Sequence, residues 1–160
     1  MTSYCILKTS MGDLLLVASE TELIGLYFDG GTCVPARKNW TLNPQHPVLR
    51  QAQEQLREFL AGKRTRFSLP LRYAGTEFQE RVWQEIAQIP YGETISYGEL
   101  ARRAGRPRAI RAAGLNTGRN PLGIVIPCHR VIGKDGSITG FAGGLEWKQH
   151  LLDLEKGAAE

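Results

Sequence analysis

A cysteine followed directly by a histidine and an arginine is the part of this sequence best suited to chemistry. Cys128, His129 and Arg130 follow Pro127, which lacks a backbone N–H and fits poorly inside a paired strand. His129 can act as a base or orient a water molecule, and the charge of Arg130 favours a thiolate over a thiol. A free cysteine more often only packs in a core, but the neighbouring residues favour a nucleophile.

Turn signals surround this segment on both sides. Residues 123–126 are apolar and predict a short buried strand that leads to Cys128. Asn120-Pro121 precedes that strand as a turn able to brace the loop. Residues 133–136 predict a tight turn, and the glycines of residues 140–144 let the backbone pass close to a large ligand. The cysteine is therefore expected at the edge of a cleft.

The first half of the chain predicts a small α/β domain over residues 1–73. Residues 4–7 and 14–18 form a hairpin, and residues 23–28 form a third strand. Residues 32–45 lack a period and predict a loop. From Pro47 to Gly62 apolar positions recur at helical spacing, and residues 67–71 predict a further strand. We expect a small antiparallel sheet with one helix, acting as a structural support.

The second half, residues 74–160, predicts a mainly helical domain. Thr76 and Gln79 are spaced as a capping box, and the following helix ends near Pro90. Ser96 to Glu99 predicts a second capping box on a helix that reaches about Ala104. After Gly105, a further helix is expected from Pro107 to about Leu115. Two short helices joined by a glycine turn predict a helix-turn-helix unit.

Five arginines crowd this unit, as a surface that contacts phosphates would require. They are Arg102, Arg103, Arg106, Arg108 and Arg111. Ala112, Ala113 and Gly114 are small, so the second helix could approach a narrow groove closely. The alternative is a merely solvated helix face.

A last amphipathic helix is expected over residues 145–155. Leu145, Leu151 and Leu152 mark its buried face, and Glu155 shares that face through its spacing. A carboxylate on an inner face needs a partner, and His129 is the candidate. Residues 157–160 predict a frayed tail.

The net charge is compatible with a nucleic-acid partner, and the cysteine usage indicates an intracellular, reducing compartment. The chain has 160 residues, is 42% hydrophobic and carries a net charge of +4. It begins with no signal-peptide pattern and holds no apolar run of spanning length, so we expect a cytoplasmic protein without membrane contact. Its three cysteines suggest free thiols. A zinc site from Cys5, Cys33 and His46 matches no compact ligand spacing, so no metal is expected.

Residues 76–155 resemble the O6-alkylguanine-DNA alkyltransferase family. The resemblance rests on Asn120, on Pro-Cys-His-Arg-Val at residues 127–131 and on Gly143-Gly144. It implies a monomeric DNA-repair methyltransferase whose cysteine takes an alkyl group from O6-alkylguanine, and also from O4-alkylthymine, in double-stranded DNA. The thioether product offers water no activated bond, so we expect one turnover per molecule and no cofactor.

The resemblance also implies a role for each matching catalytic residue. Cys128 is the nucleophile, His129 takes its proton through a water molecule, and Glu155 orients His129. Tyr97 turns out the target nucleotide and donates a proton to the leaving base. Asn120 ties the helix-turn-helix unit to the active-site strand.

The remaining implied roles concern DNA and the substrate pocket. Arg111 fills the gap left by the nucleotide flipped through the minor groove, and further DNA contacts fall to Tyr97, Ala112, Gly114 and Arg130. The pocket residues are Val131, Phe141, Ala142 and Gly143. The chain departs from the family pattern at three positions. Phe141 stands where many relatives have tyrosine, and Ala142 stands where they often have serine. Leu115 stands where they often have a smaller residue.

Three other functions remain open from the sequence. A relative that binds alkylated DNA without repairing it would lack Cys128. A helix-turn-helix regulator would use Cys128 as a redox sensor and would need sequence-specific base contacts. A cysteine hydrolase would turn over without depending on DNA.

Overall fold

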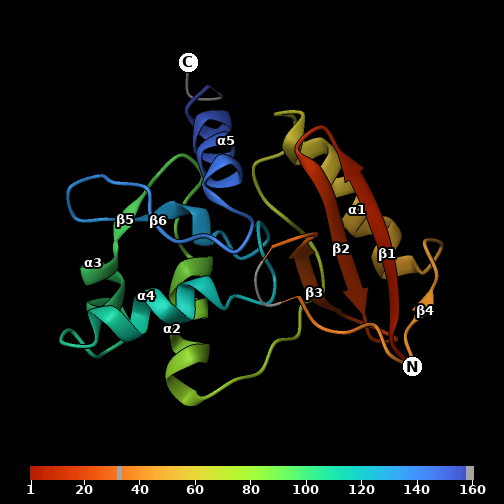
Figure 1. Ribbon diagram of the computed structural model, residues 1–160, viewed down its shortest axis with the longest axis horizontal. Coiled ribbons are helices and arrows are strands. Elements are labelled where there is room, and N and C mark those ends of the chain that lie inside the picture. The colour runs from red at the N-terminus through yellow and green to blue at the C-terminus, as the bar shows by residue number, and fades with distance from the viewer. Residues whose placement is uncertain (32–33, 158–160) are drawn as a thin grey trace.

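The chain folds as a sheet with one helix packed beside a group of four helices. The structure is a computed structural model that describes residues 1–31 and 34–157. Figure 1 shows β1, β2, β3 and α1 on one side and α2, α3, α4 and α5 on the other. This arrangement confirms the expected order of an α/β unit followed by a mainly helical one. None of the helices in the described ranges is long and apolar enough to cross a membrane.

The N-terminal sheet has four strands in the order β3-β2-β1-β4. They are β1 (Ser3–Thr9), β2 (Gly12–Ala18), β3 (Leu23–Phe28) and β4 (Thr41–Leu42). β1, β2 and β3 are antiparallel, which confirms the predicted hairpin and third strand. β4 pairs parallel to β1, so the sheet is mixed rather than purely antiparallel, and the expected loop contains one short strand. Thr32 and Cys33 lie outside the described residues.

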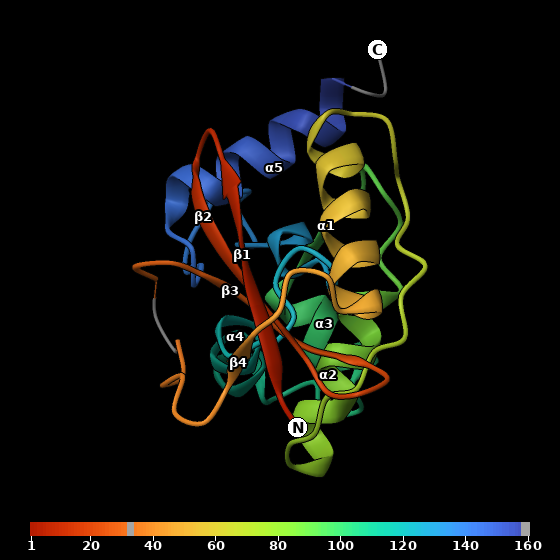
Figure 2. The ribbon, with the colours of Figure 1, turned by 90° about the vertical axis from the view of Figure 1, so that its right-hand side faces the viewer.

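Helix α1 (Pro47–Leu60) runs along one face of the sheet (Figure 2). Nδ1 of His46 accepts a hydrogen bond from the Val48 N–H and caps the helix start. Gly62 follows the C-cap with a φ of +76°, as predicted for a terminating glycine. The predicted strand at residues 67–71 is wrong, because only Leu71 bridges to β3. Pro70, beside it, has no N–H to extend the pairing.

The helical part contains four helices, two short strands and one turn of 3₁₀ helix. They are α2 (Glu77–Ala87), β5 (Ile95–Ser96), α3 (Tyr97–Arg103), α4 (Ile110–Gly118), η1 (Cys128–Arg130), β6 (Val131–Ile132) and α5 (Leu145–Gly157). α3 and α4 pack together after Gly105, whose φ is +86°, which confirms the helix-turn-helix pattern. α4 starts three residues later than predicted, because residues 106–109 close a separate turn. Leu145 is 54% exposed, so it does not belong to the buried face of α5.

The capping box of α2 is present in full. Oγ1 of Thr76 accepts from the Gln79 N–H at 3.1 Å, and Oε1 of Gln79 accepts from the Thr76 N–H at 3.0 Å. The second predicted box is only half formed. Ser96 caps α3, but the Glu99 carboxylate binds two arginines of the same helix.

Replacing Thr76 with alanine should lower the free energy of unfolding by about 1 kcal/mol, because the N-cap acceptor is lost. Chemical denaturation measures this difference. Thr76→Ser keeps the hydroxyl and serves as the control. An equal loss in both variants would mean that the methyl group, not the cap, carries the effect.

The segment before the cysteine is a turn, not the predicted strand. Ile124 has a φ of +69°, and the Ile126 N–H donates to the Leu122 carbonyl at 2.8 Å. β3 holds the start of this turn: the Leu26 N–H donates to Pro121 O, and the Gly123 N–H donates to Leu26 O. A short apolar run does not distinguish a paired strand from a buried turn, which explains the error.

Candidate active site

Cys128 opens η1 and lies almost completely buried, with 4% of its surface exposed. Its N–H donates to the Ile126 carbonyl at 2.7 Å, which fixes the residue to the preceding turn. Burial raises the pKa of the Cys128 thiol, while a hydrogen bond with Asn120 and the charge of Lys148 oppose the rise. The free protein therefore holds a thiol near neutral pH, and ionisation requires a base.

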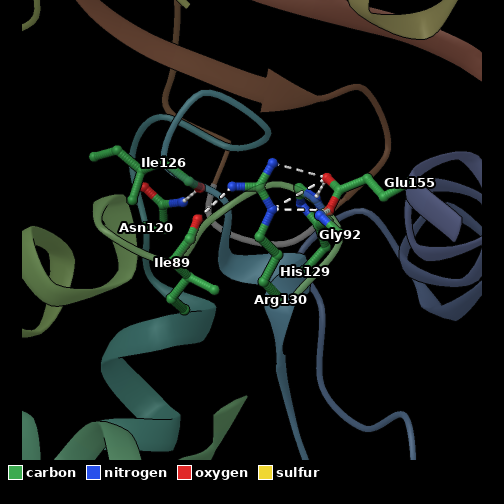
Figure 3. Close-up of polar contacts among 7 residues, drawn as sticks. All are labelled: Ile89, Gly92, Asn120, Ile126, His129, Arg130 and Glu155. Atoms are coloured by element: carbon green, nitrogen blue, oxygen red, sulfur yellow. Dashed lines mark hydrogen bonds and ion pairs between the residues drawn. The ribbon is translucent and has the colours of Figure 1, made fainter. Parts of the chain in front are cut away.

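His129 and Glu155 form a fully buried pair beside the cysteine. Nε2 of His129 lies 2.5 Å from Oε2 of Glu155, which extends from α5 (Figure 3). Oε1 of the same carboxylate accepts from the Gly92 N–H at 3.0 Å. The spacing argument that placed Glu155 on the inner face toward His129 is confirmed by this contact.

Arg130 completes the network by binding both oxygens of the same carboxylate. Its Nε lies 2.9 Å from Oε1 of Glu155, its Nη2 donates to Oε2, and its Nη1 donates to the Ile89 carbonyl at 2.6 Å. The guanidinium also lies over the ring of Tyr91. Because Arg130 is only 6% exposed and bound internally, the expectation that it contacts DNA is wrong.

The charges of this network fix where the proton of His129 lies. Burial alone would raise the pKa of Glu155, but hydrogen bonds from His129 and Arg130 outweigh it and lower this pKa to about 2. Burial lowers the pKa of His129, so the imidazole is neutral. An ionised carboxylate only accepts, so Nε2 of His129 carries the proton. Nδ1 is buried and without a hydrogen-bond partner among the described residues, which leaves its lone pair available as a base.

Asn120 braces the loop that carries the cysteine. Its Nδ2 donates to the Ile126 carbonyl at 2.7 Å (Figure 3). Its Oδ1 accepts from the Leu122 N–H at 2.9 Å. Asn120 follows the end of α4, so the side chain connects the helix-turn-helix unit to the turn before Cys128.

A buried lysine that the sequence analysis missed lies beside Tyr97. The Tyr97 hydroxyl donates to the Thr139 carbonyl at 2.9 Å, and Nζ of Lys148 donates to the same carbonyl at 2.8 Å. Lys148 is fully buried, and burial lowers its pKa to about 8. Lys148, Leu151, Leu152 and Glu155 recur at helical spacing on α5. That spacing, used for Glu155, would also have found Lys148.

The cavity at Cys128 is small and lined from both halves of the chain. Its volume is about 10 Å³, and its lining residues are Leu26, Tyr27, Phe28, Thr117, Gly118, Asn120, Gly123, Cys128 and Ala142. Of the four expected pocket residues, Ala142 lines the cavity, whereas Phe141 and Gly143 pack against Phe28. Val131 is fully buried in β6 and does not line it. No pattern in the sequence pointed to the three lining residues that come from β3.

The exposed side of α4 carries two of the residues expected to contact DNA. Arg111 and Ala112 are exposed, and the backbone of Gly114 passes close to the Tyr97 ring. Leu115 is 54% exposed on the same helix. The charges of Arg102 and Arg103 are partly offset by Glu99, whose pKa their hydrogen bonds lower to about 2. Arg106 lies over the ring of Phe78.

Two of the three residues considered as zinc ligands, Cys5 and His46, have other structural roles. Cys5 is buried in β1, where burial raises the pKa of its thiol to about 11. His46 caps α1, and Cys33 lies outside the described residues. Within the described ranges, His, Cys, Asp and Glu form no group of three able to hold a metal ion.

Comparison with known proteins covers both halves of the chain. The family model for the 6-O-methylguanine DNA methyltransferase ribonuclease-like domain matches residues 3–73, and the model for its DNA binding domain matches residues 77–157. A methylated-DNA–protein-cysteine methyltransferase of Mycolicibacterium paratuberculosis is 46% identical over 156 residues, 98% of this chain and 93% of the relative.

Two solved structures from Mycobacterium tuberculosis share the fold. The O6-methylguanine methyltransferase is 43% identical with a TM-score of 0.92, covering 100% of this chain and 96% of that chain. OGT in complex with DNA is 42% identical with a TM-score of 0.91, covering 98% and 94%. Since both family models match and relatives above 40% identity span nearly the whole chain, the chain belongs to the 6-O-methylguanine DNA methyltransferase family.

Proposed function

We propose that this protein repairs DNA by moving the alkyl group of O6-alkylguanine onto the sulfur of its own Cys128. The observation that carries the proposal is a buried Cys128 followed directly by His129, whose Nε2 contacts Glu155 and whose Nδ1 has no hydrogen-bond partner among the described residues. This arrangement occurs in a chain whose relatives are named methylated-DNA–protein-cysteine methyltransferases. One relative of the same fold has been solved in complex with DNA.

The reaction is a displacement at the alkyl carbon. The Cys128 proton passes to Nδ1 of His129 through one bridging water, and ionised Glu155 stabilises the imidazolium that forms. The sulfur–carbon bond forms while the bond between that carbon and guanine O6 breaks. The electron pair stays with the guanine, which takes up one proton, so the proton lost by the thiol is balanced. The thioether then persists, and each molecule acts once without a cofactor.

Tyr97 is the group proposed to donate a proton to the leaving guanine. Its hydroxyl lies within hydrogen-bond reach of Lys148 Nζ at 3.3 Å. Burial raises the pKa of Tyr97, so the hydroxyl keeps its proton until the guanine anion forms. Lys148 is buried beside it and can restore the proton to the phenolate.

The alkyl carbon lies inside the base stack, so the nucleotide must leave the duplex first. Unstacking costs about a few kcal/mol. Arg111 on the exposed side of α4 is proposed to occupy the gap, and the small exposed side chain of Ala112 allows close approach to the minor groove. Gly114, which leaves room for the Tyr97 ring, is proposed as a further DNA contact through its backbone. Ala142 and the backbone of Gly143 are proposed to hold the flipped base beside Cys128.

Several finer points belong to the same proposal. The division into residues 1–73 and 74–160 is supported by the ranges of the two family models and by a segment without helices between α1 and α2. One chain supplies Cys128, His129, Glu155 and Tyr97, which supports a monomer.

O4-alkylthymine, which presents a comparable alkyl ether, is a second proposed substrate. The cytoplasm is the proposed location, since Cys5 and Cys128 are free thiols.

Intact-protein mass spectrometry after mixing with a duplex that contains O6-methylguanine tests the reaction. One methyl group should be gained per protein, and peptide mapping should place it on Cys128. Removal of lesions in excess of protein would indicate a hydrolase instead. Binding of the duplex without any gain of mass would indicate a protein that only recognises the lesion or regulates transcription.

Arg111→Ala should slow repair of duplex DNA by about tenfold or more, because the gap left by the flipped nucleotide stays empty. The same variant should react with free O6-methylguanine at the unchanged rate. Single-turnover kinetics with both substrates measure the two effects. Arg108→Ala, which removes an exposed arginine just before α4, is the control for lost charge. Equal losses on duplex and free base would remove the proposed role of Arg111.

A further inference from the structure

We propose that Phe28, a residue of the N-terminal sheet, sets the size of the alkyl group that Cys128 can accept. This inference rests on the proposed function and concerns the part of the site contributed by β3. It assigns the N-terminal half a part in substrate selection, beyond the structural support expected from its sequence.

The product of the reaction needs room beside the sulfur. After transfer the alkyl group is bound to Sγ of Cys128, so it must occupy the space next to that atom. The cavity there measures about 10 Å³, which is at the lower limit for a single water molecule. A methyl group therefore already needs a small adjustment of the walls, and a benzyl group needs a wall to be displaced.

Phe28 is the largest apolar side chain in the cavity wall. Its ring packs between two backbone segments of the site. A Cβ atom built on Gly123 would lie 2.8 Å from its ring, and one built on Gly143 would lie 2.6 Å from it. Gly123 belongs to the turn before Cys128, and Gly143 belongs to the loop before α5. The ring thus fills the space that side chains at both positions would otherwise take.

Phe28 makes apolar ring contacts, whereas Asn120 and Thr117, which also line the cavity, make hydrogen bonds. The Phe28 ring meets the rings of Phe141 at 5.1 Å and Trp147 at 5.2 Å, both edge-on. Asn120 holds the loop with two hydrogen bonds, and Oγ1 of Thr117 donates to the Ala113 carbonyl. Shortening Phe28 therefore enlarges the cavity without leaving a buried polar group unpaired.

The test compares two substrates in each variant. Duplexes that contain O6-methylguanine or O6-benzylguanine are mixed with protein in excess, and the rate of mass gain on Cys128 is followed by intact-protein mass spectrometry. Phe28→Leu and Phe28→Ala should raise the ratio of benzyl to methyl transfer by about tenfold or more over the unaltered protein. Restoring bulk with Gly123→Ala in the Phe28→Leu background should lower the ratio again.

Trp147→Phe is the matched control, because it alters a ring that contacts Phe28 but does not line the cavity. Its ratio should stay at the value of the unaltered protein. If Phe28→Ala fails to fold, Phe28→Leu decides the result. An unchanged ratio in Phe28→Leu, or an equal rise in Trp147→Phe, would overturn the role of Phe28. Absence of methyl transfer by the unaltered protein would instead contradict the proposed function.

Discussion

Replacing Cys128 with alanine should abolish methyl transfer while leaving DNA binding intact. The substitution removes the sulfur that forms the new bond, and neither His129 nor Tyr97 offers an equivalent nucleophile in the 10 Å³ cavity. We expect the transfer rate to fall by about 1,000-fold or more. The exposed arginine of α4 is unaffected, so the affinity for duplex should stay the same. Mass spectrometry measures transfer, and fluorescence anisotropy with a labelled duplex measures binding.

Cys5 provides the matched control, since it is the other free cysteine among the described residues and is equally buried. Burial raises the pKa of the Cys5 thiol to about 11, and Cys5 has no histidine or lysine among the groups that shift it. Cys5→Ala should therefore transfer as fast as the unaltered protein. A methyl group found on Cys5, or transfer that persists in Cys128→Ala, would assign the nucleophile to another residue.

Local signals in the sequence predicted most of the secondary structure. The capping box at Thr76, the glycine after α1 and the turn between β1 and β2 each depend on a few adjacent residues, and each is present. The errors fall where tertiary contacts decide. Residues 123–126 are apolar enough for a strand, yet a positive φ at Ile124 and the pairing of Leu26 with the preceding segment make them a turn.

The residues of the candidate site were likewise predicted where local signals suffice and missed where tertiary contacts decide. Cys128 and His129 are adjacent in sequence, and Glu155 followed from helical spacing, so all three were predicted together. Arg130 was assigned to DNA because sequence does not reveal that Glu155 and the Ile89 carbonyl bind its guanidinium inside the protein. Phe28 comes from the other half of the chain, and only the packing of β3 against the turn brings it to the cysteine.

Glu155→Gln should slow transfer by about 100-fold or more and also destabilise the protein. A glutamine amide can donate to Nε2 of His129, which places the imidazole proton on Nδ1 and removes the lone pair needed as a base. The buried guanidinium of Arg130 would also lose its anionic partner. Breaking a buried ion pair on one side costs about 3–5 kcal/mol. Single-turnover kinetics and chemical denaturation measure the two effects separately.

Acid should reduce the difference in stability between this variant and the unaltered protein. The Glu155 pKa of about 2 in the folded protein lies below the ordinary value of about 4.3 for an unfolded chain. A lowered folded pKa contributes stability that is complete above the unfolded value and is lost as the pH falls toward the folded one. The difference in unfolding free energy should therefore shrink between about pH 5 and about pH 2.

A fall in stability alone would not establish that Glu155 positions the base, so the kinetics need a separate control. Glu146→Gln neutralises an exposed carboxylate in the first turn of the same helix and should change neither rate nor stability. Both proteins are compared well below their unfolding temperatures, where each is fully folded. If Glu155→Gln then transfers methyl groups at the unaltered rate, its carboxylate only balances the charge of Arg130. A rate that stays low in the folded variant means that His129 works as a base because Glu155 holds its proton on the far nitrogen.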